Sequence, residues 1–325
     1  MNTPRDIYDL AYQYLIVIFA GIPATILYNL LSGYLRSLGN SVIPVIFLII
    51  SAVLNIGLDL LFILTFHMGV FGAAFATVLS QAISGVLCLI YIMKKITLLH
   101  ITRDDLQLSR QYVKNLIIMG FPMGFQYSIT AIGSVILQTA VNSLGSTAVA
   151  SMTAASKISM FVVCPFDALG STMATYSGQN VGAGKFDRVK KGLVSASLLG
   201  SIYAVAIFVV LFFSCNYLIY MFVSPDETEV IRQAHQFLLY NAAFYVPLVF
   251  VNTVRFAIQG MGFSGFAMFA GVAEMIARSL VGLALVPVFG FSAACFASPL
   301  AWIFADSFLI PAFIHCLNKL KRTIS

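Results

Sequence analysis

Charged residues are scarce in this sequence. Asp, Glu, Lys and Arg make up 9% of the 325 residues, whereas 60% are hydrophobic. A soluble globular chain carries roughly 25% charged residues, so a water-soluble protein is excluded and most side chains must face lipid. The net charge of +6 could suggest a nucleic-acid partner. The basic residues gather in short segments between apolar runs instead, which is typical of membrane insertion and argues against nucleic acid.

The sequence also lacks the motifs of soluble enzymes. Its five cysteines form no CxxC pair, so we expect small buried apolar residues rather than zinc ligands or disulfides. After Gly184-Lys185, Phe186 stands where a P-loop has Ser or Thr, and the motifs HExxH and GxSxG are absent. We therefore expect no enzyme, no nucleotide partner, no cofactor and no metal beyond a coupling ion, H⁺ or Na⁺.

Long apolar runs are what the sequence has in abundance. A run of about 20 residues is long enough to cross a bilayer as a helix. The runs are continuously apolar rather than alternating, which favours helices over a β-barrel. We therefore predict an all-α membrane protein of about nine transmembrane helices, at residues 10–35, 43–66, 69–93, 115–142, 147–177, 193–222, 233–258, 265–287 and 290–316.

The basic residues predict an orientation. Of the 18 Lys and Arg residues, Arg5 and Arg232 fall on one side of the predicted membrane, beside the acidic turn Asp226-Glu227. The larger set on the other side is Arg36, Lys94, Lys95, Arg103, Arg110, Lys114, Lys185, Arg188, Lys190, Lys191, Arg255, Lys319, Lys321 and Arg322. Basic loops stay in the cytoplasm. We predict a multi-pass protein of the cell membrane with a cytoplasmic C-terminus and an N-terminus outside.

The sequence contains an internal repeat. The matched pairs, at offsets of 221 to 223 residues, include Gln13 with Gln236, Asn29 with Asn252, Gly39 with Gly262, and Gly69 with Gly290. The first three spans thus resemble the last three in the same orientation, while the middle three have no counterpart. A parallel repeat of six plus six helices, lacking its first three, would explain both this pattern and the outside N-terminus. Chance matching among apolar helices is the rival explanation.

Several polar residues fall inside the predicted spans, where a charge costs at least about 2.5–3.5 kcal/mol to insert. Asn55 and Asp59 lie four residues apart on one helix face, and Thr77 falls at similar depth on the next span. Their oxygens could bind a proton or a sodium ion. The alternative is a hydrogen-bonded cluster that only stabilises helix packing.

The remaining intramembrane charges lie in the second half of the chain. Glu274 and Arg278, also four residues apart, are expected to form a structural ion pair. Lys157 and Asp167 are ten residues apart on one span, too far for a direct pair, so each is expected to face a polar cavity or to extend toward the membrane surface. Asp306 has no partner that the sequence reveals.

Several motifs, in order along the whole chain, resemble one known family. The segment 176–190 (YSGQNVGAGKFDRVK) is similar to the loop after the eighth helix of multidrug and toxic compound extrusion (MATE) transporters. The segments 35–40 (LRSLGN), 55–59 (NIGLD) and 69–77 (GVFGAAFAT) resemble their fourth to sixth helices. The segment 120–126 (GFPMGFQ) resembles the start of their seventh helix.

The resemblance implies a two-lobe fold of six plus six helices that exports organic cations against a proton or sodium gradient. Residues 1–93 would be the second half of the N-terminal lobe, 94–114 a cytoplasmic linker and 115–325 the C-terminal lobe. We therefore expect an N-terminally incomplete copy of the fold.

The resemblance also implies a cation site. In the branch similar to DinF, the residues that match Asn29, Asn55, Asp59 and Thr77 form it, together with an aspartate on a first helix that this sequence lacks. A second branch carries an acidic residue early in its seventh helix, where Gln126 is the nearest polar residue here. The DinF-like branch is therefore favoured.

The leading expectation is antiport of small amphipathic organic cations, with membrane lipid as surroundings. A flippase for lipid-linked oligosaccharides or lipids, of the same superfamily, is the first alternative. It should have more basic side chains in its cavity than Lys157 and Arg278. An intramembrane enzyme is the second alternative, and it would need catalytic residues clustered at one depth.

The predicted topology can be tested by cysteine labelling. In a cysteine-free background, a cysteine at Ser224 should react with an impermeant reagent added to intact cells, and one at Ser109 should react only after permeabilisation, because basic segments stay inside. Labelling of position 109 from outside would overturn the orientation.

Overall fold

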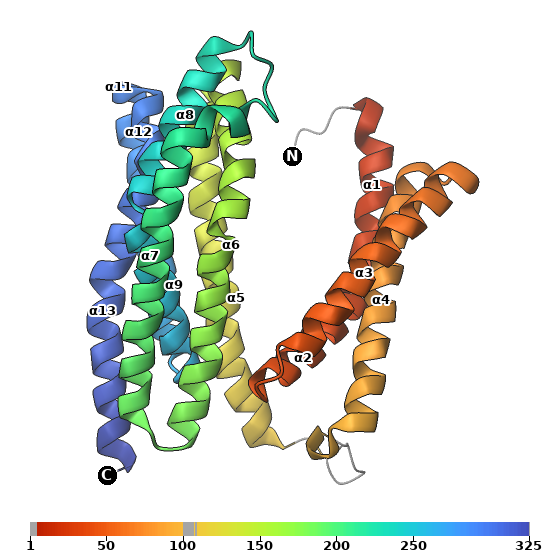
Figure 1. Ribbon diagram of the computed structural model, residues 1–325, viewed down its shortest axis with the longest axis vertical. Helices are drawn as coiled ribbons and strands as arrows, with labels where there is room; N and C mark the ends of the chain where they lie inside the picture. The colour runs from red at the N-terminus through yellow and green to blue at the C-terminus, as the bar shows by residue number, and fades with distance from the viewer. Residues whose placement is uncertain (1–4, 100–106, 108, 325) are drawn as a thin grey trace. The chain divides into compact units, whose positions relative to one another are not determined.

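The computed structural model describes residues 5–99, 107 and 109–324, and these contain helices and no strand. The chain divides into two compact units, Met1–Leu108 and Ser109–Ser325. The division falls within the predicted linker 94–114, of which residues 100–106 and 108, Arg103 included, lie outside the described part. Figure 1 shows the helices of each unit.

Unit 1 is built from helices α1 (Arg5–Ala20), α2 (Ile22–Ser37), α3 (Val42–Leu60) and α4 (Gly69–Lys95). A π-helical turn, η1 (Leu61–Thr65), extends α3, and a short 3₁₀ turn, η2 (Thr97–Leu99), follows α4. The chain bends by 43° between α1 and α2. Pro23 suits this place, because a proline in the first turn of a helix removes an N–H that has no partner there.

Unit 2 begins with three long helices, α5 (Arg110–Asn142), α6 (Ser146–Gly182) and α7 (Phe186–Ile219). A bent pair follows, α8 (Thr228–Ala243) and α9 (Tyr245–Gly260), with an angle of 54°. The last segments are α10 (Ser264–Leu280), the π turn η4 (Val281–Leu285), α11 (Val286–Phe289), α12 (Phe291–Cys295) and α13 (Ala297–Ile324).

The nine predicted spans correspond to these helices. In the described part, 7 helices are long and apolar enough to cross a membrane, or up to 9 if each bent pair is one span. The bends in α1–α2 and α8–α9 were not predicted, because the apolar run continues through them without a break. The all-α membrane fold is confirmed.

The internal repeat is visible in the backbone. Unit 1 has a bent pair, a glycine with positive φ (Gly39, 85°), a helix ending in a π turn and a second such glycine (Gly69, 55°). Unit 2 ends with the same series, with Gly262 at 91° and Gly290 at 62°. A positive φ is costly for residues other than glycine. The turns at these positions therefore keep glycine in both copies, and chance matching no longer explains the repeat.

The two units differ in how much they bury. In unit 1, α4 packs against α1, α2 and α3, and the buried core is small, with Leu35 and Cys88 at its centre. The most apolar window of α3 and η1 is 6% buried, against 50% for Phe291–Arg322 in unit 2. Unit 2 has a large core that includes Phe166 and Tyr245. Apolar side chains of α3 therefore lie on the outside of unit 1.

The crossing of α6 and α9 in unit 2 depends on small residues. A Cβ atom added to Gly260 would lie 2.2 Å from the carbonyl oxygen of Ala174, and one added to Gly178 would lie 3.3 Å from the carbonyl oxygen of Gly260. Glycines at such positions let membrane helices approach closely, so that van der Waals packing holds them together.

Replacing Gly260 should therefore destabilise unit 2. Gly260→Ala forces a methyl group against backbone atoms, and such overpacking costs about 1–3 kcal/mol. Gly265→Ala is the matched control, because no atom lies within 4 Å of the added Cβ there. Thermal unfolding of the purified protein in detergent would measure both. Equal unfolding temperatures for the two variants would show that α6 and α9 can move apart without a loss of stability.

Candidate functional site

The first candidate site lies between α3 and α4 of unit 1. The Asn55 side-chain amide donates a long hydrogen bond, 3.5 Å, to the Thr77 hydroxyl oxygen, and that hydroxyl donates to the carbonyl oxygen of Ala73 at 3.0 Å. Asp59 lies one turn further along α3 on the same face. Its Oδ1 atom is buried and has no hydrogen-bond partner among the described residues. Three of the four predicted cation ligands thus come from two adjacent helices.

Asn29, the fourth predicted ligand, is placed differently. Its side chain is exposed on α2, and within the described residues no hydrogen bond joins it to Asn55, Asp59 or Thr77. Helix α2 is connected to α4 instead by the Thr25 hydroxyl, which donates to the Gln81 side-chain oxygen. This pair was not predicted from the sequence, although Gln81 follows Thr77 by one helical turn on the same face.

The first site is chemically suited to a proton or a small hard cation. Carboxylate, amide and hydroxyl oxygens are the ligands that such cations take. Oδ1 of Asp59 is a buried acceptor without a donor. Such an atom is costly unless something binds it, and this fits a site for a proton or a cation.

Unit 2 holds a second polar cluster, centred on Glu274 of α10. One carboxylate oxygen of Glu274 accepts from the Arg255 guanidinium group, and the other lies 3.3 Å from Nη2 of Arg278. Glu274 is 3% exposed, Arg255 8% and Arg278 9%. The ion pair expected between Glu274 and Arg278 is present, and a second arginine shares the same acid.

The sequence prediction for Arg255 was wrong. We expected it in a basic cytoplasmic segment, but it lies inside α9, buried against Glu274. Arg255 lies five residues before the end of α9, and it was therefore expected at the membrane surface. Its partner Glu274 is 19 residues away on another helix, so spacing along one helix does not reveal the pair. The remaining basic residues of that predicted set still outnumber Arg5 and Arg232.

The other predicted polar residues of unit 2 have distinct surroundings. Asp306 of α13 is half-buried with an unpaired Oδ1, and it interacts electrostatically with Arg255, as does the exposed Asp167 of α6. The exposed Lys157 lies 5.7 Å from the ring centroid of Phe222. Gln126 of α5 is buried and accepts a hydrogen bond of 2.9 Å from Gln259. Within the described residues none of them forms a hydrogen bond or ion pair with Glu274, and Asp306 interacts with Glu274 electrostatically.

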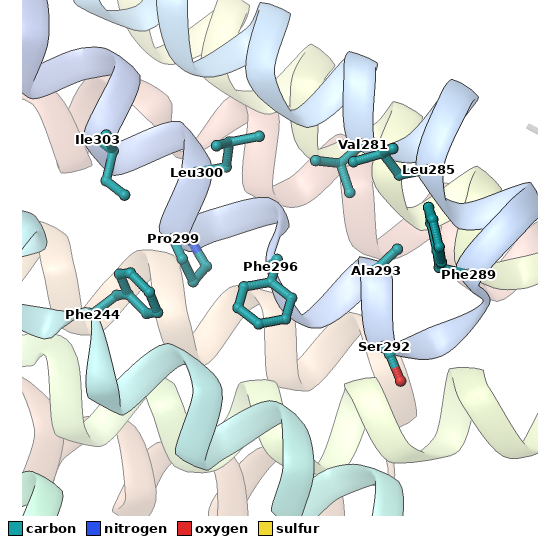
Figure 2. Close-up of a pocket in the computed structure, with 10 residues that line it drawn as sticks. All are labelled: Phe244, Val281, Leu285, Phe289, Ser292, Ala293, Phe296, Pro299, Leu300 and Ile303. Atoms are coloured by element: carbon teal, nitrogen blue, oxygen red, sulfur yellow. The ribbon is translucent and has the colours of Figure 1, made fainter.

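Two cavities flank the bend between α8 and α9. The first, of about 490 Å³, is apolar, and among its lining residues Ser292 is the one with a polar side chain. Figure 2 shows it, with Phe244 on one side and Phe289 on the other. The second, of about 340 Å³, is lined by hydroxyl, amide and aromatic side chains and by Arg278.

Helices long enough to span a membrane, a parallel internal repeat and polar clusters within the helices define a multi-pass α-helical membrane protein. The MatE protein family matches residues 1–61 and 122–286 of the chain. The chain therefore belongs to the MATE family, whose members are transporters and not enzymes.

Two curated proteins that are similar to this chain are named as probable multidrug resistance proteins. The chain is 32% identical over 255 residues to the probable multidrug resistance protein YpnP of Bacillus subtilis (78% of this chain, 56% of the relative). It is 25% identical over 253 residues to the probable multidrug resistance protein YoeA of the same organism (76% and 54%). The chain thus spans about half the length of these curated relatives.

Solved structures share the fold. A crystal structure of MATE in complex with MaL6 superposes with a TM-score of 0.89 at 21% identity, covering 99% of this chain and 73% of that one. An outward-facing multidrug resistance MATE family transporter gives 0.90 at 20% identity, covering 99% and 72%. At these identities the likeness establishes the fold alone.

The buried cluster of unit 2 yields a stability prediction. Glu274→Gln would remove the carboxylate that two buried guanidinium groups share, and breaking a buried ion pair in this way costs about 3–5 kcal/mol. The control is Glu229→Gln, since the ion pair of Glu229 with Arg232 is exposed and contributes little. Denaturant unfolding in detergent would compare the two. A Glu274→Gln protein as stable as the control would show that the arginines find other partners.

Proposed function

We propose that this protein is a secondary active antiporter that exports small amphipathic organic cations, drugs among them, in exchange for H⁺ or Na⁺. Membership of the MATE family supports this, as do the multidrug resistance names of the Bacillus subtilis relatives. The absence of a P-loop in the sequence favours an ion gradient over ATP as the source of energy.

The observation that carries the proposal is the unpaired carboxylate oxygen of Asp59. An isolated carboxylate inside a membrane is costly to insert, and binding a proton or a sodium ion would remove that cost. Asn55, one turn from Asp59 on α3, and its hydrogen-bond partner Thr77 on α4 would contribute ligands to a sodium ion or accept a hydrogen bond from a protonated Asp59. Asn29 would join them only after a change in the position of α2.

Binding at Asp59 can be coupled to conformation through α3 and α4. The Asn55–Thr77 hydrogen bond is long, and it is one of the few side-chain links between these two helices. A cation held between Asp59 and Thr77 would draw the helices together, and its release would loosen them. An ion that binds one arrangement better than the other shifts the equilibrium between them.

We further propose residence in the cell membrane with a cytoplasmic C-terminus. Lys321 near the end of α13 lies 2.7 Å from Asp187 at the start of α7. The terminal basic residues and the basic segment 185–191 therefore share one end of unit 2. The acidic turn at Asp226-Glu227 follows α7, at the far end of that helix. Basic ends of this kind remain in the cytoplasm.

A flippase for lipid-linked oligosaccharides or lipids remains the second candidate, because Arg278 lines the polar cavity of unit 2. That cavity, of about 340 Å³, is small for an oligosaccharide headgroup, and Arg278 is its one basic lining residue. Antiport of small molecules is therefore the better supported function.

The proposal predicts that Asp59→Asn abolishes transport without reducing the amount of protein in the membrane. The amide keeps the size of the side chain but neither takes up a proton nor supplies a negative charge to sodium. Ethidium efflux from cells, driven by an imposed proton or sodium gradient, would measure this, with Asp226→Asn in the loop between α7 and α8 as control. Efflux by Asp59→Asn at the rate of the unmodified protein, still dependent on the gradient, would limit Asp59 to a structural role.

A further inference from the structure

The polar cavity of unit 2 is formed by the side chains of six helices. Its hydroxyl and amide groups come from α5, α6, α8, α9 and α13, and include Ser159, Asn241 and Tyr245. Arg278 of α10 is the charged residue in the lining, and the lining contains no Asp or Glu. The charged group that this cavity offers to a ligand is therefore a guanidinium group.

Arg278 has hydrogen-bonding capacity left over. Its side chain is almost fully buried, and Nη1 has no partner among the described residues, while Nη2 faces Glu274. Glu274 divides its negative charge between Arg278 and Arg255. The further acids Asp167 and Asp306 interact with Arg255 rather than with Arg278. Nη1 of Arg278 is thus an unpaired donor, and it belongs to a cavity-lining side chain.

Two further polar groups line the same cavity. The buried hydroxyls of Ser159 and Tyr245 interact with each other, and no hydrogen bond joins them to a third group within the described residues. Nη1 of Arg278 is then a buried donor without a partner, which is unusual because buried polar groups are normally satisfied. An oxygen-bearing anion would accept a hydrogen bond from it, and a second from the hydroxyl that accepts within the Ser159–Tyr245 pair, since that hydroxyl keeps its own proton to donate. Aromatic walls from Phe237 and Trp302 complete the cavity.

We propose that this cavity binds the anionic oxygen group of a small aromatic amphiphile, such as a carboxylate, with the group held by Arg278. Guanidinium groups bind carboxylate and phosphate oxygens in a planar, charge-assisted geometry. The apolar body of the ligand packs against Trp302 and Phe237. The site is separate from the proposed cation site in unit 1, and it widens the expected ligands from organic cations to molecules that also carry an acid.

The chain supplies its own reporter for this site. It has one tryptophan, and that residue, Trp302, lines the cavity. A bromine atom quenches indole fluorescence only at close range. A brominated ligand that enters the cavity should therefore quench all of the tryptophan fluorescence of the protein.

The test is a titration of the purified 325-residue protein in detergent with 4-bromobenzoate and, in parallel, with its methyl ester. We expect saturable quenching by the acid and at least tenfold weaker quenching by the ester, because only the acid carries the anionic group. Equal quenching by the two compounds would overturn the proposal, and so would no saturable quenching by the acid. Binding needs no ion gradient, so either failure would leave the proposed antiport standing.

Substitutions test whether Arg278 is the residue that binds the anionic group. Arg278→Gln should lose the preference for the acid, Arg278→Lys should keep part of it, and Lys157→Gln is the matched control, because Lys157 is an intramembrane base outside this cavity. An acid preference unchanged in Arg278→Gln with normal tryptophan emission would overturn the role of Arg278. If Arg278→Gln does not fold, the acid and ester comparison in the unmodified protein decides.

Competition identifies the source of the anion. Inorganic phosphate that displaces 4-bromobenzoate would support a site for small free anions. Displacement by phosphatidylglycerol added to the micelles, and not by phosphate, would support a lipid headgroup as the natural ligand. Displacement by the uncharged methyl ester instead would contradict recognition of an anion.

Discussion

The sharing of Glu274 between two arginines is the interaction on which unit 2 depends. A bilayer offers no water to a charged group, so each charge inside it must find its partner within the protein. Arg255 belongs to α9, beyond the bend, and Glu274 and Arg278 to α10. The cluster therefore joins two of the helices that line the polar cavity, and it positions Arg278 on the cavity wall. Arg278 is the charged side chain in that wall.

The same backbone plan carries different chemistry in the two units. In unit 1, Asn55 and Asp59 lie six and two residues before the π turn at Leu61; in unit 2, Glu274 and Arg278 lie seven and three residues before the π turn at Val281. Unit 1 places an amide and a carboxylate with an unpaired oxygen at this position, where we propose that a cation binds. Unit 2 places an ion pair there, whose charges are held by fixed partners.

Much of the fold could be predicted from the sequence, because the bilayer imposes a length and a composition on each span. The repeat followed from residues matched at offsets of 221 to 223, and the pairing of Glu274 with Arg278 from their spacing of four residues along one helix. Contacts between helices were harder to predict. The burial of Arg255 and the Thr25–Gln81 hydrogen bond arise from helix packing, which spacing does not reveal. The bends at Gly21 and Phe244 interrupt runs that remain apolar throughout.

The π turn η4 has a consequence for the helix that continues beyond it. A π turn accommodates one residue more than an α turn, and one residue corresponds to about 100° of rotation in a helix with 3.6 residues per turn. The side chains of α11, which follows Leu285 directly, are thus turned by more than a quarter of a circle from where an uninterrupted continuation of α10 would place them. In unit 1 the helix ends with η1, so this change of phase belongs to the second copy of the repeat. A helical wheel drawn through Ser264–Phe289 therefore assigns lipid-facing and protein-facing positions wrongly on one side of η4, and a single residue inserted or deleted there would turn the outward-facing positions by the same angle.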